Sequence, residues 1–230
     1  MRNLHLKDVS SWCPSRKFIS CTQEDQVVID YFNGKTNGFL LDISAADGIT
    51  GSNSFRLIND YDWSGLLVEP CPKHKPNLET LYSDIDDVDV FYGAINESKD
   101  YLTFHELSSD AVGMSYTAER SHGNPENCPF PIIGTYEVPA ISINKLLEKH
   151  NVPSQIDFFS LDIEGAELEV LNYIDMSKYN IELWCIELDD SSIILYGDDV
   201  YDKFFIDNGY EKLDISRYHI ARENIFWVKK

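Results

Sequence analysis

The chain has 230 residues, of which 43% are hydrophobic, enough to bury the core of one large domain and too many for a disordered chain. Its formal net charge of -20 repels phosphate backbones, so neither DNA nor RNA is expected as its main partner. The five cysteines form no Cys-x-x-Cys pair, and their odd number favours a reducing compartment. Since the sequence has no signal-like N-terminus and no apolar run of about 18 residues, we expect a cytoplasmic protein that does not contact membranes.

The first part of the chain predicts an arm, a helix, and a strand that leads into small residues. Residues 1–21 are irregular and are expected to form an N-terminal arm. A helix follows, opened by the Thr-x-x-acid pattern of residues 22–25 and stopped near Gly34. Residues 39–43 predict a buried strand, and the small side chains of residues 44–48 would let a ligand approach the backbone. With a helix N-cap at residues 52–53, this unit suits nucleotide binding, although plain strand-to-helix connections look the same.

The middle of the chain predicts further strands and a long irregular stretch. Residues 66–68 and 88–95 read as the second and third strands, and residues 101–104 alternate as an edge or hairpin strand does. Residues 108–138 are rich in glycine and proline and are too long for an idle loop, so we interpret them as a lid or a substrate-binding insertion. A short helix over residues 143–147 follows.

The last part of the chain continues the alternation of strands and helices. Strands are predicted at residues 156–161, 181–188 and 225–228, with helices over residues 168–174 and 200–205. This order predicts a single α/β domain over residues 1–230, with a doubly wound, mostly parallel sheet. The final hairpin places an antiparallel strand at or near the edge of that sheet.

Acidic residues stand at or near the carboxyl ends of four predicted strands: Asp42, Glu69, Asp162 and Glu187. Ligands of open α/β sheets bind at those ends, and an acid after the second strand suits the hydroxyls of a ribose. One such carboxylate alone would most simply be solvated. Four at equivalent positions predict a shared pocket.

Three segments resemble the signatures of the FkbM-type S-adenosylmethionine-dependent methyltransferases. They read L-D-I-S-A-A-D-G-I-T-G-S-N-S, W-S-G-L-L-V-E-P and I-D-F-F-S-L-D-I-E-G-A-E-L-E-V-L, and the resemblance extends from about residue 22 to the end. It implies a class I methyltransferase (Rossmann-like) fold, with a seven-stranded sheet whose last strand is antiparallel. It also implies methyl transfer to a hydroxyl of a sugar, a glycan or a small natural product.

The same resemblance implies which residues would contact S-adenosylmethionine. Residues 42–48 would cradle the methionine part, Glu69 would hold the ribose hydroxyls, and residues 94–96 would lie near the adenine. The full set implied for the cofactor is Gln23, Asp42, Ser44, Ala45, Ala46, Asp47, Gly48, Ser52, Asn53, Glu69, Pro70, Ala94, Ile95, Asn96 and Asp162. The family pattern has glycine at the position of Ser44 and often asparagine at that of Ala46, and serine tolerates a positive φ less well than glycine.

Methylation of a hydroxyl needs a group that removes its proton or a metal that acidifies it. The resemblance places Asp162 and Glu164 at the methyl-transfer site, and Asp162 and His219 are candidate bases. Asp162 with Asp189 or Asp190 could instead hold Mg²⁺ or Mn²⁺ through carboxylate oxygens.

Two other functions fit parts of the sequence. A NAD-dependent oxidoreductase would also use a strand–turn–helix unit and an acid after the second strand, but residues 38–51 contain no G-x-G-x-x-G. A non-catalytic module could keep the fold with a degraded cofactor site, and Ser44 is the feature that suggests it.

Overall fold

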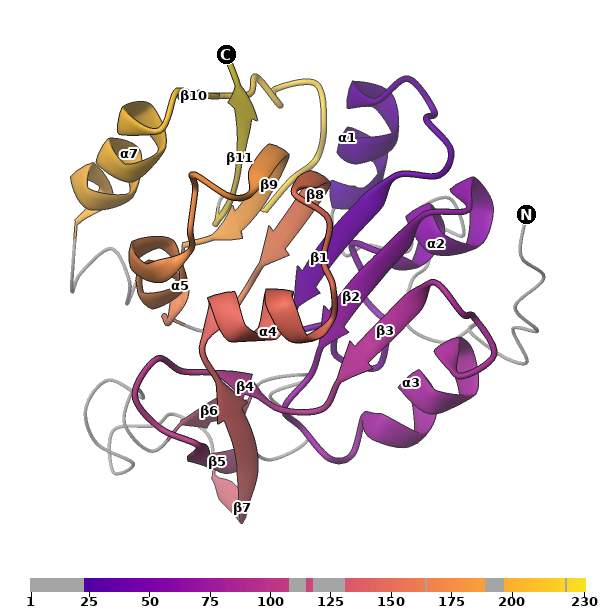
Figure 1. The fold of residues 1–230 in the computed structure, drawn as a ribbon, viewed down its shortest axis with the longest axis vertical. Helices are drawn as coiled ribbons and strands as arrows, with labels where there is room; N and C mark the ends of the chain where they lie inside the picture. The colour runs from indigo at the N-terminus through magenta and orange to yellow at the C-terminus, as the bar shows by residue number, and fades with distance from the viewer. Residues whose placement is uncertain (1–22, 108–114, 118–130, 164, 189–196, 222) are drawn as a thin grey trace.

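A seven-stranded sheet forms the centre of the protein (Figure 1). The computed structural model describes residues 23–107, 115–117, 131–163, 165–188, 197–221 and 223–230. The strand order is β10-β11-β9-β8-β1-β2-β3, in which β11 is antiparallel to both neighbours and the other adjacent pairs are parallel. The strands are β1 (Phe39–Ile43), β2 (Ser64–Val68), β3 (Val88–Phe91), β8 (Gln155–Leu161), β9 (Asn180–Glu187), β10 (Tyr210–Lys212) and β11 (Asn224–Lys229). This confirms the predicted α/β fold class, with β11 one strand inside the edge.

Helices cover both faces of this sheet. One face packs against α1 (Glu24–Tyr31), α2 (Phe55–Tyr61) and α3 (Lys75–Tyr82), and the other against α4 (Ile143–Lys149), α5 (Glu167–Tyr173) and α7 (Asp198–Asp207). The core on the α1, α2 and α3 side is the first core, and the core on the α4, α5 and α7 side is the second. Because side chains alternate along a strand, Leu40 and Phe158 enter the first core while Leu41 and Phe159 enter the second. Burial on both faces explains why these strands read as continuous apolar runs in the sequence.

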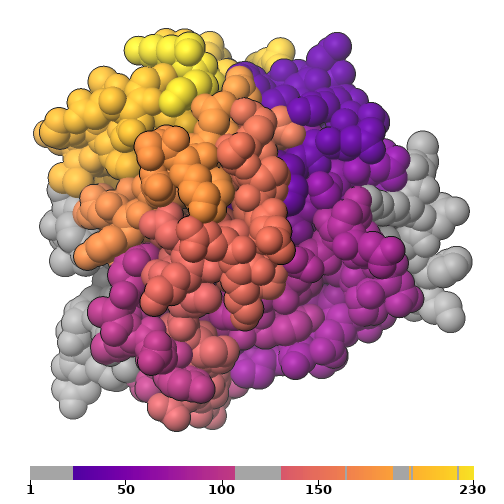
Figure 2. Space-filling model, in the orientation of Figure 1, coloured from indigo at the N-terminus to yellow at the C-terminus, as the bar shows by residue number. Residues whose placement is uncertain are grey.

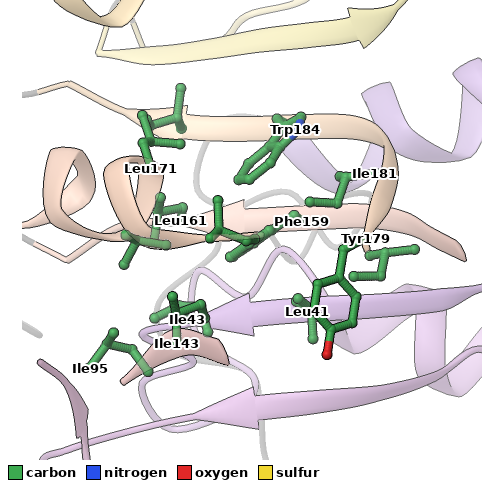
Figure 3. Close-up of a cluster of buried hydrophobic side chains, with 14 of the residues drawn as sticks. Leu41, Ile43, Ile95, Ile143, Phe159, Leu161, Leu171, Tyr179, Ile181 and Trp184 are labelled. Atoms are coloured by element: carbon green, nitrogen blue, oxygen red, sulfur yellow. The ribbon is translucent and has the colours of Figure 1, made fainter. Parts of the chain in front are cut away.

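The core on the α4, α5 and α7 side holds more of the buried aromatic side chains than the other core does. Figure 3 shows Leu41, Phe159 and Trp184 on the neighbouring strands β1, β8 and β9, and the rings of Phe159 and Trp184 stack with centroids 4.5 Å apart. Burying one such side chain contributes roughly 1.5–3 kcal/mol. In the space-filling view, chain from the second half of the sequence covers the centre of this face, so the main sheet is hidden there (Figure 2).

A smaller sheet lies on the side of the molecule to which β1, β2, β3, β8 and β9 point (Figure 1). Its order is β4-β7-β5-β6, with strands β4 (Ala94–Ile95), β5 (Tyr101–Leu107), β6 (Ser115–Thr117) and β7 (Ile132–Ile141). The prediction of an alternating strand at residues 101–104 is therefore confirmed. The description of residues 108–138 as irregular is wrong for β6 and for the part of β7 that falls within that range.

The predicted third strand, residues 88–95, is divided between the two sheets. Residues 88–91 form β3 in the main sheet, and residues 94–95 form β4 in the smaller one. Gly93 stands at the division, where a Cβ atom would lie 2.5 Å from the carbonyl oxygen of Pro139. The chain can turn from one sheet to the other there because glycine has no side chain.

Helix boundaries agree with most of the predicted signals. Gly34, at φ 69°, donates its N–H to the Ile29 carbonyl and ends α1 as predicted. Helix α3 was not predicted, because only Leu78 and Tyr82 of its eight residues are buried and its pattern is mostly polar. Residues 1–22, which include the predicted arm, lie outside the described residues. Among the described helices, none is long and apolar enough to cross a membrane.

Candidate functional site

The ends of three neighbouring strands bring predicted site residues to one edge of the main sheet. Ile43, the last residue of β1, is in register with Val68 at the end of β2 and with Leu161 at the end of β8. Glu69 and Asp162 follow these strands directly, and the Asp162 N–H donates to the Ile43 carbonyl at 3.3 Å. The carboxyl ends of parallel strands are where ligands of such sheets bind. The structure thus brings the acid-bearing strand ends together as the sequence predicts.

Glu69 joins the turns that follow β1 and β2. The side chain is buried, and its Oε2 accepts the N–H of Ala46 at 2.8 Å while Oε1 accepts the N–H of Cys71 at 2.7 Å. Burial raises the pKa of Glu69 from 4.5 to about 7, helped by the nearby Asp42 charge and opposed by the two N–H bonds and Lys73. The carboxylate is therefore fixed in place and poised to titrate near neutral pH.

The turn from Ser44 to Gly48 has an unusual backbone. Ser44 has φ 86°, Ala46 has φ 50° and Gly48 has φ 80°, so two of the three left-handed positions carry a side chain. The left-handed region costs about 1–2 kcal/mol for residues other than glycine. The N–H groups of Ser44 and Ala45 both donate to the Val68 carbonyl, at 2.9 and 3.0 Å, and hold the turn against β2.

The second half of this turn is fixed by its own side chains and by α3. Asp47 Oδ1 accepts the N–H groups of Ile49 and Thr50, at 2.9 and 2.7 Å, which closes the turn locally. The Tyr82 hydroxyl of α3 donates to the Gly48 carbonyl at 3.0 Å. A Cβ at Gly48 would come within 2.8 Å of Leu78, so the close packing of α3 also requires glycine there.

Asp42 lies inside the protein and anchors the start of α2. Its Oδ2 accepts the Ser54 hydroxyl at 2.6 Å, and burial raises its pKa to about 6. Ser52 Oγ accepts the Phe55 N–H at 3.0 Å, but the N-cap position of α2 is Ser54, so the predicted N-cap at residues 52–53 is wrong by one residue. The Asn53 amide donates to Ser160 Oγ on β8 at 3.0 Å. Asp42, Ser52 and Ser54 are thus linked by hydrogen bonds, while Asn53 and Ser160 form a separate pair; all but Ser54 and Ser160 were predicted for the cofactor.

The residues predicted near the adenine belong to the smaller sheet. Ala94 and Ile95 are buried in β4, with their side chains in hydrophobic clusters, so only their backbone is available to a ligand. The Asn96 side-chain carbonyl accepts the N–H groups of Ser98 and Lys99. Pro70, next to Glu69, is half-buried. A contact of these residues with the adenine stays a prediction.

Gln23 and His219 meet beside the start of β11. Gln23 precedes α1 and has φ 85°. Its side-chain carbonyl accepts the backbone N–H of His219 at 2.8 Å. The first residue of β11, Asn224, pairs with Glu187 at the end of β9 and donates to Glu24 Oε1 at 2.8 Å. This segment therefore lies toward the edge that carries Glu69 and Asp162. The His219 side chain is exposed, and its role as a base stays a prediction.

The loop after β8 is held by Glu167, a residue to which the sequence analysis assigned no role. Glu167 Oε1 accepts the N–H groups of Ile163 and Gly165, at 2.9 and 3.1 Å, while its buried Oε2 has no hydrogen-bond partner among the described residues. Burial raises its pKa to about 7, and the Glu187 charge adds to this. Glu167 is the second glutamate of the Asp-x-Glu-Gly-x-Glu motif, and that spacing was the signal available in the sequence.

Two predicted residues of the reaction site cannot be placed. Glu164 and Asp189 lie outside the described residues, as does Asp190. Asp162 is half-buried at the end of β8. A metal site formed by Asp162 and Asp189, and a role for Glu164, therefore stay predictions.

The edge fits a sulfonium nucleoside in two respects. The side chains of Ser44, Ala45 and Ala46 are small, so a ligand can approach the turn closely. Each Glu69 oxygen accepts one N–H, and since a carboxylate oxygen has two lone pairs, each can still accept a ribose hydroxyl. These residues would hold S-adenosylmethionine.

Comparison with known proteins gives one family match over most of the chain and several solved structures of low sequence identity. Residues 42–211 match the sequence profile of a family described as the methyltransferase FkbM domain. None of the curated proteins compared with the chain matches it. The similar solved structures include a fibrillarin pre-rRNA processing protein of Methanococcus jannaschii, with 13% identity, a TM-score of 0.45, and coverage of 84% of this chain and 66% of that one.

Two further solved structures have similar TM-scores against this chain. Fibrillarin of Aeropyrum pernix, solved with natively bound S-adenosyl-L-methionine, has 14% identity and a TM-score of 0.44, and 84% of this chain and 67% of that chain are covered. Precorrin-6y C5,15-methyltransferase of Geobacter metallireducens has 12% identity and a TM-score of 0.45, with coverage of 99% of this chain and 97% of that one. This chain spans about two thirds of the length of the two fibrillarins.

The family match carries the assignment. It begins at Asp42, includes Glu69 and Asp162, and extends to residue 211 of 230. The sheet, with its antiparallel β11, is that of the class I methyltransferase fold expected for such a protein. The chain belongs to the methyltransferase FkbM domain family.

Proposed function

We propose that the protein transfers the methyl group of S-adenosylmethionine to a hydroxyl oxygen of a sugar, a glycan or a small natural product. The observation that carries this proposal is the common edge formed by the 44–48 turn, Glu69 and Asp162, whose strands are in register. The family assignment favours S-adenosylmethionine over NAD as the ligand of that edge.

Binding of the cofactor would use groups that the fold already fixes. Glu69 would accept the ribose hydroxyls, because its two N–H bonds hold both oxygens in position. The turn of small residues would lie against the methionine part. When bound, S-adenosylmethionine supplies an electrophilic methyl group on a positively charged sulfur.

The protein's own part in the reaction is alignment and proton removal. Holding the acceptor oxygen in line with the methyl carbon can lower the barrier by several kcal/mol, roughly 7–11 in the best intramolecular cases. When its oxygen takes the methyl group, the acceptor hydroxyl would pass its proton to a base on the protein, and the thioether would remain as the leaving group. We assign that base to Asp162, which Glu167 supports by fixing the loop behind it. A metal ion on Asp162 and Asp189 is the alternative way to acidify the hydroxyl.

The acceptor would lie between this edge and the smaller sheet. Lys73, after β2, is 3.8 Å from Glu106 of β5, so the two parts of the protein meet beside Glu69. Residues 108–138, which we interpret as the substrate-binding insertion, include β6 and part of β7 of the same sheet. A surface with a net charge of -20 suits a neutral polyhydroxyl acceptor better than a nucleic acid. A cytoplasmic location remains our expectation from the sequence.

The experiment is a transfer assay with methyl-labelled S-adenosylmethionine and a panel of glycosides and hydroxylated small molecules, with and without EDTA. We expect labelled ether product, with Asp162→Asn lowering turnover at least a hundredfold, on the scale of lost base catalysis. Asp84→Asn, at an exposed turn position, is the matched control and should keep the wild-type rate. Loss of activity in EDTA would assign the proton step to a metal. Cofactor binding without transfer to any acceptor would favour a non-catalytic module.

A further inference from the structure

The turn that follows Glu69 brings three different metal-binding side chains together. Glu69, Cys71 and His74 each offer one ligand atom, and these atoms lie within 4.8 Å of one another. Cys71 and His74 belong to none of the three motifs on which the family resemblance rests. We propose that this trio binds Zn²⁺, and that Zn²⁺ and S-adenosylmethionine exclude each other because both require Glu69. The exclusion rests on the proposed function, whereas the metal site does not.

The local fold pre-arranges the three ligands. The Cys71 N–H donates to Glu69 Oε1 at 2.7 Å, and the His74 N–H donates to the Cys71 carbonyl at 3.1 Å. All three side chains therefore come from one six-residue segment whose backbone is fixed by its own hydrogen bonds. Outer hydrogen bonds of this kind orient the ligands of metal sites. The second bond to Glu69, from the Ala46 N–H, serves the same purpose.

The spacing is close to that of a tetrahedral site. Zinc bonds of about 2.0–2.3 Å at tetrahedral angles place ligand atoms about 3.3–3.6 Å apart. From their 4.8 Å limit the present atoms must therefore approach one another by about 1.2–1.5 Å at most, which side-chain rotations can supply. His74 is half-buried, so it can rotate and provides the route by which an ion enters, while Cys71 and Glu69 are buried. The fourth position would be left to water.

The chemistry of the trio selects the metal. A thiolate and an imidazole favour Zn²⁺ over Mg²⁺ or Ca²⁺, which prefer oxygen ligands. The ring nitrogens of His74 and the sulfur of Cys71 are the two ligand types that set this trio apart from an all-carboxylate site. Binding would release the thiol proton of Cys71.

The surrounding charge favours a divalent cation. The carboxylates of Asp42, Asp47 and Glu106 act on Glu69 or His74, and Lys73 is the opposing positive group. The Lys73 ammonium is partly offset by Glu106, 3.8 Å away. Three negative groups besides Glu69 therefore face one positive group around the site.

The test uses Co²⁺ and Zn²⁺ as probes on the intact chain. Co²⁺ should give a thiolate-to-metal charge-transfer band that is lost in Cys71→Ser and in His74→Gln and kept in His150→Gln, which alters a histidine paired with Asp89 elsewhere. His74 is half-exposed, so His74→Gln keeps the test valid if Cys71→Ser fails to fold. A band that persists in His74→Gln, or no band in the wild type, would overturn the site.

Exclusion is measured by titrating S-adenosylhomocysteine with and without Zn²⁺. With free Zn²⁺ at ten times its own Kd, mutual exclusion raises the apparent Kd of S-adenosylhomocysteine about elevenfold by mass action. The increase should vanish in His74→Gln. An unchanged Kd in the wild type would refute the exclusion. If S-adenosylhomocysteine does not bind the metal-free protein at all, the proposed function fails, while the cobalt band still decides the metal site.

Discussion

Replacing Glu69 by glutamine is expected to change how the stability of the ligand-free protein depends on pH. Burial raises the pKa of Glu69 from 4.5 to about 7, so the folded protein holds the proton more tightly than the unfolded chain. This contribution to stability is complete below about pH 4.5 and is lost as the pH rises through 7. The difference in pKa corresponds to about 3 kcal/mol. Glutamine cannot ionise, so its contribution does not vary with pH.

The assay is urea unfolding of the wild type and of Glu69→Gln between about pH 5 and 8.5. At the acid end of this range, where Glu69 of the wild type is protonated, the variant should be about 1–3 kcal/mol less stable, because its amide NH₂ group faces one of the two backbone N–H donors. The advantage of the wild type should therefore shrink by about 3 kcal/mol, or reverse, toward high pH. Glu211→Gln, an exposed glutamate, is the control and should run parallel to the wild type. Parallel curves for wild type and Glu69→Gln would refute the raised pKa.

Three further predictions follow from the site. Ser44→Gly should stabilise the protein by about 1 kcal/mol in denaturant unfolding, because φ 86° is relieved, whereas Ala45→Gly, which has no positive φ, should destabilise it. Glu167→Gln should keep both loop hydrogen bonds and be at least as stable as the wild type at pH 8. Glu167→Ala should lose about 2 kcal/mol or more of stability and lower turnover. Equal stability of both variants would be inconsistent with the contacts of Glu167 to Ile163 and Gly165. The affinity for S-adenosylhomocysteine should rise about tenfold from pH 6 to pH 8 as Glu69 ionises, and a flat profile would argue against Glu69 as the hydroxyl acceptor.

The parts of the fold that could be predicted are those buried on both faces. Runs such as Leu40-Leu41 and Phe158-Phe159 identify central strands because each neighbour in the run enters a different core. The positions of Glu69 and Asp162 then follow, since each comes directly after such a strand. The family resemblance, in which glycine stands at the position of Ser44, also pointed to a positive φ there, and Ser44 has φ 86°.

The features that were missed depend on contacts distant in sequence. The division of residues 88–95 between two sheets is decided by Gly93 packing against Pro139, which no local pattern reveals. Helix α3 could not be predicted because its two buried residues are too few to show the hydrophobic period of a helix. Glu167 lies in a recognised motif, but its role is visible only once the loop folds back and presents the N–H groups of Ile163 and Gly165.

Isothermal titration calorimetry with S-adenosylhomocysteine decides whether Glu69 belongs to a cofactor site. We predict that the wild type binds it, and that Glu69→Ala weakens binding by about 1–3 kcal/mol, roughly 5- to 150-fold, because the ribose hydroxyls lose their acceptor. Glu211→Ala should bind as the wild type does. Equal affinities for wild type and Glu69→Ala, or no binding to the wild type, would contradict a cofactor site at this edge of the sheet.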